Sequence, residues 1–400
     1  MSRRIELLAP AGDIYRGQIA LDFGADAIYF GGKQYSLRAR ASNFDYDELR
    51  EMINITHNLN KKAYIVTNIL CHNIHLNNLN TFFQKLISFK PDGFICADPA
   101  IIQKIRSIDK QIPIHISTQQ SVTNSKAALF WKRNNANRVV LAREISHKEL
   151  KELVKNINHQ VELEYFIHGA VCVAYSGRCV LSNNYCMRDA NIGGCAQSCR
   201  WKYNLSSAEH NYANNFSMSA KDMNQISNLK KILELGIDSL KIEGRMKKEH
   251  YLATVCCSYS NAINEFLQEN KITHLKRWKQ ELNKIANREV NDAWFNGKPK
   301  NNAMLDSAVE KQVNQNYAFI IKKVINHNTW EILSKNYFTV NNHFEVFGRD
   351  YLPIKFKIKK ITDKENNSLS VVNTPFRVYL IKVNKKLTKI HTNDMVRIIN

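Results

Sequence analysis

The 400-residue chain is poor in glycine and proline, with 14 and 7 residues respectively, and 44% of its residues are apolar. This composition excludes collagen-like, low-complexity and globally disordered chains. No stretch approaches the ~18 uninterrupted apolar residues that a membrane helix needs. Glu6 and Pro10 interrupt the first apolar run, so we expect no signal peptide. The sequence therefore predicts a folded, soluble, cytoplasmic protein.

Acidic residues are also scarce, because 36 Asp and Glu stand against 57 Lys and Arg, a formal net charge of +21. An excess of this sign and size is typical of proteins that bind polyanions, and nucleic acid is the leading candidate. The alternative is a Lys- and Asn-rich composition that reflects an AT-rich genome. Charge alone does not decide between the two.

The first 245 residues alternate short apolar runs with helical patterns. Eight of these runs are typical of buried parallel strands, at residues 5–10, 27–31, 63–68, 93–98, 112–118, 138–143, 161–168 and 238–243. Capping-box patterns mark helix starts at Asp45 with Glu48 and at Ser146 with Glu149. Eight strand–helix repeats predict an α/β fold, a (β/α)8 TIM-like barrel.

The step from the seventh to the eighth strand is much longer than the others, which predicts an insertion. We place a Cys-rich insertion at residues 170–235, within a barrel of residues 1–268. Loops that follow the strands form the active face of this fold, so the insertion is expected over the barrel mouth. A charged helical linker is predicted over residues 269–305.

Over residues 306–400 the pattern changes to short segments in which apolar and polar residues alternate. Such segments predict a small antiparallel, barrel-like β domain. The segments lie at 317–325, 329–333, 343–347, 353–361, 368–372 and 377–383. The last hundred residues hold sixteen Lys and Arg against eight Asp and Glu. Alternation places Lys355, Lys357 and Lys359 on one face of a strand, which favours RNA binding; a solvated face that keeps a sheet edge soluble is the alternative.

Five of the nine cysteines fall within 28 residues, namely Cys172, Cys179, Cys186, Cys195 and Cys199. In a reducing compartment such clustering indicates a metal or redox site before disulfides. Structural zinc sites usually contain Cys-x-x-Cys pairs, and the segment has none. Four thiolates at this loose spacing favour an iron–sulfur cluster, with zinc as the alternative. Cys186 is either a spare thiol or an alternative ligand.

The segment EYFIHGAVC at residues 164–172, followed by GRCVLS at 177–182, closely resembles the signature of peptidase family U32. Blocks at residues 8–12, 24–29, 36–41 and 241–245 also resemble that family, so the resemblance covers the whole barrel. The chain length, the Cys195 and Cys199 pair and the basic C-terminal domain are most similar to the branch that hydroxylates tRNA, long labelled as proteases.

This resemblance implies a tRNA-modifying enzyme that contributes to 5-hydroxylation of the wobble uridine by an oxygen-independent route. It implies tRNA as substrate and prephenate, a small dicarboxylate, as co-substrate. Carried over residue by residue, it also implies that Cys172, Cys179, Cys195 and Cys199 hold an iron–sulfur cluster of the 4Fe-4S type. Cys186 matches no ligand position of the family.

Strand ends supply the candidate site residues, because they meet at the barrel mouth. Arginine binds carboxylates and phosphates through a planar fork of donors. We therefore expect Arg38, Arg40 and Arg143, together with Arg178 of the cysteine segment, to bind substrate. We expect His168, Glu243 and Arg245 to take part in catalysis. The alternatives are structural ion pairs for the arginines, with Glu144 and Glu243 as partners, and a structural role for His168.

Aromatic and basic residues flank the cysteines, and Arg200 and Trp201 are the RNA-binding candidates among them. Ordinary packing of the insertion onto the barrel is the alternative.

Two other functions stay open. The chain lacks the His-Glu-x-x-His and Gly-x-Ser-x-Gly motifs of common hydrolases. A cysteine peptidase using Cys172 or Cys179 with His168 remains possible in principle. A non-catalytic iron–sulfur RNA-binding protein is the other alternative.

Overall fold

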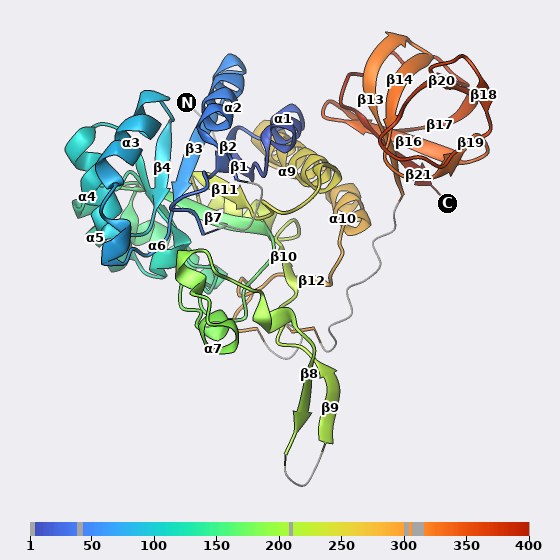
Figure 1. Cartoon of the computed structure of the whole chain (residues 1–400). Coiled ribbons are helices and arrows are strands. Elements are labelled where there is room, and N and C mark those ends of the chain that lie inside the picture. The colour runs from blue at the N-terminus through green and yellow to red at the C-terminus, as the bar shows by residue number, and fades with distance from the viewer. Residues whose placement is uncertain (1–4, 38–42, 208–210, 300–303, 306–315, 400) are drawn as a thin grey trace. The chain divides into compact units, whose positions relative to one another are not determined.

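The computed structural model describes residues 5–37, 43–207, 211–299, 304–305 and 316–399 (Figure 1). It divides into two compact units, the first formed mainly by residues 25–311 and the second mainly by residues 312–400. The first unit carries the predicted barrel and the cysteines, and the second is the basic β domain.

Eight parallel strands form the barrel of the first unit, with the order β11-β1-β2-β3-β4-β5-β6-β7 and closure by pairing of β7 with β11. They are β1 (Glu6–Pro10), β2 (Ala27–Phe30), β3 (Lys62–Thr67), β4 (Gly93–Cys96), β5 (Ile114–Ile116), β6 (Arg138–Val140), β7 (Glu162–Gly169) and β11 (Ser239–Ile242). Nearly all of their residues are buried, as expected for strands covered on both faces. The predicted TIM-like barrel is confirmed.

Helices surround the strands (Figure 1). They are α1 (Ile14–Asp22), α2 (Tyr46–Asn58), α3 (Leu79–Ser88), α4 (Pro99–Ile108), α5 (Ser125–Arg133), α6 (His147–Ile157), α8 (Leu229–Glu234) and α9 (Glu249–Glu269). Both predicted capping boxes are present: Asp45 caps α2 with Glu48, and Ser146 caps α6 with Glu149. These caps satisfy N–H groups that a helix leaves unpaired, so they fix where each helix begins.

The insertion between β7 and α8 contains α7 (Leu181–Cys186), the hairpin of β8 (Tyr203–Ser206) with β9 (Asn211–Phe216), and β10 (Asp222–Asn224). β10 pairs antiparallel with the end of β7 and parallel with β12 (Val290–Asn291). The hairpin projects away from the barrel (Figure 1). Since α8 is the helix that precedes the eighth barrel strand, the inserted segment ends before residue 229.

The segment predicted as a helical linker packs onto the barrel unit. Its helix α10 (Leu275–Lys284) buries Trp278 and Leu282, and the Trp278 indole N–H donates to Glu265 of α9 over 3.0 Å. A linker would leave these side chains in water, so residues 275–284 belong to the first unit.

The second unit is an antiparallel barrel with the order β16-β21-β13-β14-β20-β17, closed by pairing of β16 with β17. Its strands are β13 (Tyr317–Asn326), β14 (Thr329–Ser334), β16 (His343–Gly348), β17 (Tyr351–Thr362), β20 (Val378–Val383) and β21 (Met395–Ile399), with short strands β15 (Phe338–Thr339), β18 (Ser368–Leu369) and β19 (Val371–Val372). On β17, Lys355, Lys357 and Lys359 are exposed, while Phe356 and Ile358 between them are buried.

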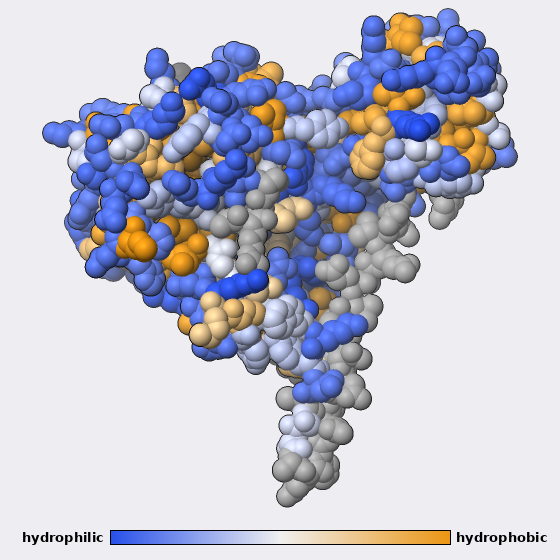
Figure 2. Space-filling view, viewed as in Figure 1, coloured by the Kyte–Doolittle hydropathy of each residue, from blue (hydrophilic) through white to orange (hydrophobic). Residues whose placement is uncertain are grey.

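Within the described residues, no helix is both long and apolar enough to cross a membrane. The face of the molecule shown in Figure 2 is largely hydrophilic, with apolar side chains in small groups.

Candidate active site at the barrel mouth

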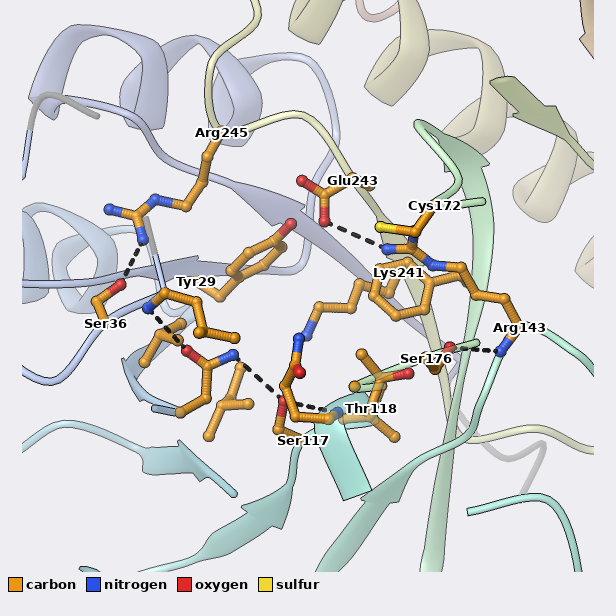
Figure 3. Close-up of a pocket in the computed structure, with 18 of the residues that line it drawn as sticks. Tyr29, Ser36, Ser117, Thr118, Arg143, Cys172, Ser176, Lys241, Glu243 and Arg245 are labelled. Carbon is orange, nitrogen blue, oxygen red and sulfur yellow. Dashed lines mark hydrogen bonds and ion pairs between the residues drawn. The ribbon is translucent and has the colours of Figure 1, made fainter. Parts of the chain in front are cut away.

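A cavity of about 130 Å³ opens where the barrel strands end (Figure 3). Three cations line it, from Arg143, Lys241 and Arg245, together with the carboxylates of Glu144 and Glu243. The remaining wall is mixed polar and apolar, and includes Tyr29, Ser36, Asn68, Ser117, Phe166 and Cys172. A small cavity with this charge balance is suited to an anionic ligand.

Arg143 follows β6 and is about nine-tenths buried. Its guanidinium lies 4.0 Å from the ring centroid of Phe166 and donates to the carbonyl of Ala170 over 2.6 Å. It also forms an ion pair with Glu243 at 3.4 Å (Figure 3). The Phe166 ring and the Ala170 carbonyl fix the plane of the guanidinium. The ion pair with Glu243 is longer, so a ligand carboxylate can compete with Glu243 for the guanidinium.

Arg245 follows β11 and holds the loop after β2. Its Nη1 donates to Ser36 Oγ over 2.9 Å, and its Nη2 donates to Asn43 Oδ1 over 2.6 Å. Arg38 and Arg40, predicted to bind substrate, lie outside the described residues. Arg245 therefore hydrogen-bonds the described residues on both sides of this segment, Ser36 before it and Asn43 after it.

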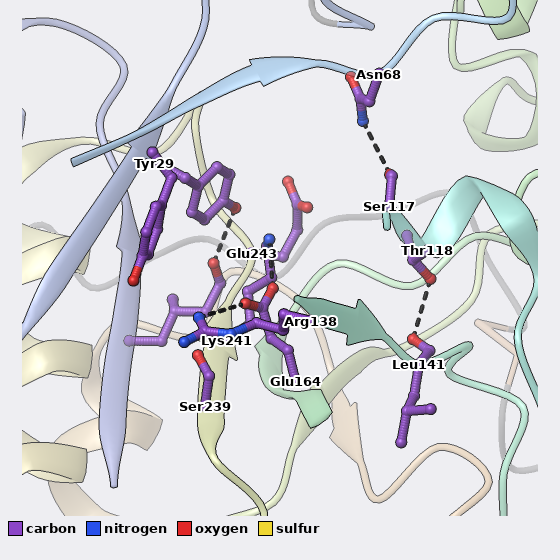
Figure 4. Close-up of polar contacts among 12 residues, drawn as sticks. Tyr29, Asn68, Ser117, Thr118, Arg138, Leu141, Glu164, Ser239, Lys241 and Glu243 are labelled. Atoms are coloured by element: carbon purple, nitrogen blue, oxygen red, sulfur yellow. Dashed lines mark hydrogen bonds and ion pairs between the residues drawn. The ribbon is translucent and has the colours of Figure 1, made fainter. Parts of the chain in front are cut away.

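Lys241 forms the floor of the cavity and was not among the predicted site residues. Its ammonium pairs at 2.7 Å with Glu164, which is fully buried, and lies 4.3 Å from the centroid of the Tyr29 ring. Figure 4 shows Glu164 between Lys241 and Arg138, and its carboxylate pairs with Arg138 at 3.2 Å. Arg138 in turn contacts Glu6 across the barrel. This interior network fixes the ammonium position, because each buried charge has an opposite partner. Alternation along the strand places residues 241 and 243 on the same face. The sequence could therefore have predicted that Lys241 lines the cavity together with Glu243.

The loop that begins the cysteine segment is anchored to neighbouring strand ends. Ser176 donates through its N–H and its hydroxyl to the Glu144 carboxylate, at 3.0 and 2.8 Å. Gly177 has φ +73°, and a Cβ there would lie 2.1 Å from the carbonyl oxygen of Gln119. Only glycine permits this close approach. The loop between Cys172 and Cys179 is thereby fixed against the barrel.

The four cysteines predicted as ligands interact with one another. Burial raises the pKa of the Cys179 thiol, as do the thiols of Cys172 and Cys195, while the backbone N–H groups of Leu181 and Ser182 hydrogen-bond its sulfur and oppose the rise. Burial also raises the pKa of Cys199, where Arg200 opposes the rise and the thiols of Cys172, Cys195 and Cys179 add to it. These four thiols therefore lie within electrostatic range of one another.

Cys186 lies close to the segment that carries Cys199. Its sulfur is 3.5 Å from Ser198 Oγ, and Ser198 is buried. Burial raises the pKa of the Tyr203 hydroxyl, and Tyr185, Cys199 and Cys186 add to the rise. Whether Cys186 is a spare thiol or an alternative ligand stays a prediction.

Four cysteine thiols are the donor set that an iron–sulfur cluster takes, and zinc can take the same set. Among the described residues, no three Cys, His, Asp or Glu side chains converge as a site for a single metal ion. The iron–sulfur cluster therefore stays a prediction from the sequence.

A second cavity, of about 350 Å³, is lined by Cys172, Cys195 and Cys199. It also contains the side chains of Lys247 and Arg288. Leu37, Arg143, Cys172 and Glu243 line both cavities. The Arg143–Glu243 pair and Cys172 therefore form a common wall between the barrel cavity and the cysteine-lined cavity.

His168 does not line either cavity. Simple alternation would place it on the same face as Glu164 and Phe166, but the register of β7 against β11 shifts by one residue after Phe166, so that His168 pairs with Ile242. Its ring is buried against α9, 3.3 Å from the hydroxyl of Tyr259, and burial together with Lys247 lowers its pKa to about 3. This neutral, buried ring favours the structural alternative over proton transfer.

The remaining predicted residues lie on the outside of the cysteine segment. Arg178 and Trp201 are exposed, and Arg200 is half-buried and lines the second cavity. Tyr175, Tyr185 and Trp201 are between 43% and 54% exposed, so three aromatic rings of this segment face water. Arg178 does not line the barrel cavity, and its predicted substrate contact would have to be made outside it.

Comparison with known proteins identifies the family. The sequence profile of peptidase family U32 matches residues 12–305, and that of the U32 C-terminal domain matches residues 314–397. This chain belongs to peptidase family U32. The match covers both structural units. The resemblance of the sequence blocks predicted it for the barrel.

Several relatives within the U32 family carry names that state a function. The chain is 38% identical to tRNA hydroxylation protein P1 of Bacillus subtilis, over 99% of this chain and 95% of that protein. It is 33% identical to tRNA hydroxylation protein P of Escherichia coli, over 65% of this chain and 68% of that protein. It is also 31% identical to a collagenase of Porphyromonas gingivalis, over 73% of each chain. Both tRNA hydroxylation and peptide hydrolysis are thus named among its relatives.

Proposed function

We propose that this U32 protein is a tRNA-modifying enzyme that contributes to 5-hydroxylation of the wobble uridine, with prephenate as co-substrate and a 4Fe-4S cluster on Cys172, Cys179, Cys195 and Cys199. One observation carries the proposal: the cationic barrel cavity and the cysteine-lined cavity share a wall made by Arg143, Glu243 and Cys172. An anionic co-substrate and a cluster would therefore meet at one place. Two of its relatives are named tRNA hydroxylation proteins, which supports tRNA hydroxylation as the reaction.

The residues of the barrel cavity would bind and orient the co-substrate. Arg143 offers a fixed guanidinium to one carboxylate, and the Lys241 ammonium on the cavity floor offers a point charge to the other. Glu243 is paired with Arg143 at 3.4 Å and would be displaced from it as the anion enters. Arg245 would act as a positioning residue, because its donors hold the loop after β2.

The cysteine segment would hold the cluster and receive the RNA. When bound, an iron–sulfur cluster supplies one-electron redox chemistry. The N–H groups of Leu181 and Ser182 hydrogen-bond the Cys179 sulfur and oppose the rise that burial causes in the pKa of this thiol. They would keep hydrogen-bonding the sulfur when it ligates iron. The exposed rings of Tyr175 and Trp201, near Arg178 and Arg200 in the chain, would stack on an unpaired base of the anticodon loop.

The second unit would add non-specific affinity for tRNA. Lys355, Lys357 and Lys359 are exposed on β17, where they can reach phosphates without disturbing the buried face of the strand. We expect the protein to act in the cytoplasm, where tRNA is found and thiols stay reduced.

Peptide hydrolysis by a cysteine nucleophile is the weaker candidate. A cysteine peptidase needs a histidine beside its thiol to remove the proton. Among the described residues, no histidine lines either cavity, and His168 is directed toward Tyr259 on α9.

The test is nucleoside mass spectrometry of tRNA from cells that have no second wobble-uridine hydroxylase. We expect 5-hydroxyuridine-derived nucleosides to disappear on deletion of the gene, to return with the wild-type chain, and to stay absent with Cys179→Ala. The matched Cys186→Ser variant should restore them. Unchanged tRNA in the deletion strain would overturn the proposal.

A further inference from the structure

The second unit exposes an aromatic side chain that its own fold does not use. Phe376 lies in the loop before β20 and is 71% exposed. The ammonium of Lys335 lies 5.3 Å from the centroid of its ring, and the neighbouring Arg377 is exposed. Tyr337, two residues after Lys335, is 60% exposed. An aromatic ring with one cation against it, and a second exposed cation next to it in the chain, thus stands at one end of this barrel.

The backbone at Phe376 is held in a conformation that its side chain disfavours. Its φ is +61°, in the left-handed region that bulky residues rarely adopt. The buried Ser334 fixes the loop: its carbonyl accepts from the Phe376 N–H over 2.8 Å, and its hydroxyl donates to the carbonyl of Thr374 over 2.8 Å. The Arg377 N–H is bonded to the same hydroxyl at 3.1 Å. Neither the backbone strain nor the exposed ring stabilises the fold, so this combination indicates a function.

We propose that Phe376, with Lys335 and Arg377, is a stacking platform for an unpaired base of bound tRNA. This inference rests on the proposed function, because it takes tRNA as the partner. Every base has a π-face, and stacking on an aromatic ring beside cations is the usual way in which proteins hold single-stranded nucleic acid. The excess of sixteen Lys and Arg over eight Asp and Glu in residues 301–400 favours a polyanion over an apolar protein partner.

The platform is separate from the lysine face of β17. Phe376 precedes the start of β20, whereas Asn384, just after the end of β20, donates its N–H to the carbonyl of Lys357. The six residues of β20 lie between the two places, a span of roughly 20 Å at about 3.3 Å per residue. The domain would therefore contact tRNA twice, with lysines on phosphates at one end and a ring on a base at the other.

The test measures binding of unmodified tRNA to the full-length protein by fluorescence anisotropy at one fixed salt concentration. We expect Phe376→Ala to weaken binding about tenfold, which corresponds to ~1.4 kcal/mol, because it removes the ring on which a base stacks. Phe376→Trp should stay within twofold of wild type, because it keeps an aromatic ring. Phe376→Leu should behave like Ala, because it is apolar but cannot stack. Ile325→Ala, which truncates another side chain of this unit with 51% exposure, is the matched control and should bind like wild type.

A second readout separates binding from structure. Phe376→Asn relieves the left-handed strain, so the thermal midpoint of unfolding should equal or exceed that of wild type while tRNA affinity falls. Wild-type tRNA affinity in both Phe376→Ala and Phe376→Asn would overturn the platform and leave the proposed function standing. Failure of the wild-type protein to bind tRNA would overturn both.

Discussion

Replacement of Gly169 by alanine should disable the site while leaving the barrel folded. Gly169 ends β7, three residues before Cys172, and its φ is +110°. A Cβ at this position would lie 2.3 Å from the carbonyl oxygen of Glu243 and 2.9 Å from its Cβ. Because backbone atoms are in the way, β7 and β11 would have to separate at the point where Cys172 and Glu243 face the two cavities.

Gly236 provides a matched control, because it has φ +76° and a Cβ there would meet nothing within 4 Å. Alanine at Gly236 should therefore cost only the backbone strain of the left-handed region, about 1–2 kcal/mol. Alanine at Gly169 should cost this strain plus an overpacking penalty of about 1–3 kcal/mol. With an unfolding entropy of ~2.1 cal/mol/K per residue over roughly 300 residues, each kcal/mol lowers the thermal midpoint by about 1.6 °C.

The assay combines calorimetry with nucleoside mass spectrometry. We expect Gly236→Ala to lower the midpoint by roughly 2–3 °C with full tRNA hydroxylation, and Gly169→Ala to lower it by roughly 3–8 °C with at least a tenfold loss of hydroxylation. If Gly169→Ala hydroxylates tRNA as well as Gly236→Ala does, the close contact of β7 with β11 does not position the site, and the reasoning is refuted.

Three further results are expected. Arg143→Lys should raise the co-substrate KM about tenfold, because an ammonium cannot form the two parallel hydrogen bonds of a guanidinium; steady-state kinetics with an unchanged KM would speak against a carboxylate at Arg143. Glu164→Gln should destabilise the barrel by about 3–5 kcal/mol, since it leaves the buried Lys241 ammonium without its carboxylate partner. Lys241→Met should cost less, because Glu164 keeps its ion pair with Arg138. The double variant should lose about 1–3 kcal/mol less than the sum of the two, and strict additivity in denaturant unfolding would contradict the pair. The pKa of His168 is about 3 in the fold and near 6.5 when unfolded, so the unfolded chain binds more protons below pH 6.5 and stability falls as the pH drops toward 3. Between pH 7 and 5, protonation of His168 in the unfolded chain should lower the free energy of unfolding by about 2 kcal/mol. Urea unfolding of His168→Asn should therefore depend less on pH than that of the wild type. An equal pH dependence in both proteins would mean that His168 is not buried as a neutral ring.

Most of the barrel could be predicted from the sequence, because strands covered on both faces are continuous apolar runs. β1 and β3 were expected within about a residue, and both capping boxes were found at the predicted positions. In the second unit, alternation predicted β13 and β17 but β21 was missed, because Met395–Ile399 is short and follows a lysine-rich segment without a clear alternating pattern.

The interior charges could not be predicted in the same way. Glu164, Arg138 and Lys241 lie on three different strands, and only closure of the barrel brings them together. The outward turn of His168 depends on a register shift between β7 and β11, which leaves no mark in the sequence of either strand. The clustering of the cysteines, by contrast, was visible in their spacing alone.

The most direct test of the account is the iron and acid-labile sulfide content of the protein purified without oxygen. We predict about four irons and four sulfides per chain for the wild type and for Cys186→Ser, and loss of both in Cys172→Ser, Cys179→Ser, Cys195→Ser and Cys199→Ser, in parallel with loss of tRNA hydroxylation. A single tightly bound zinc ion, or full iron content in the four serine variants together with its loss in Cys186→Ser, would contradict it.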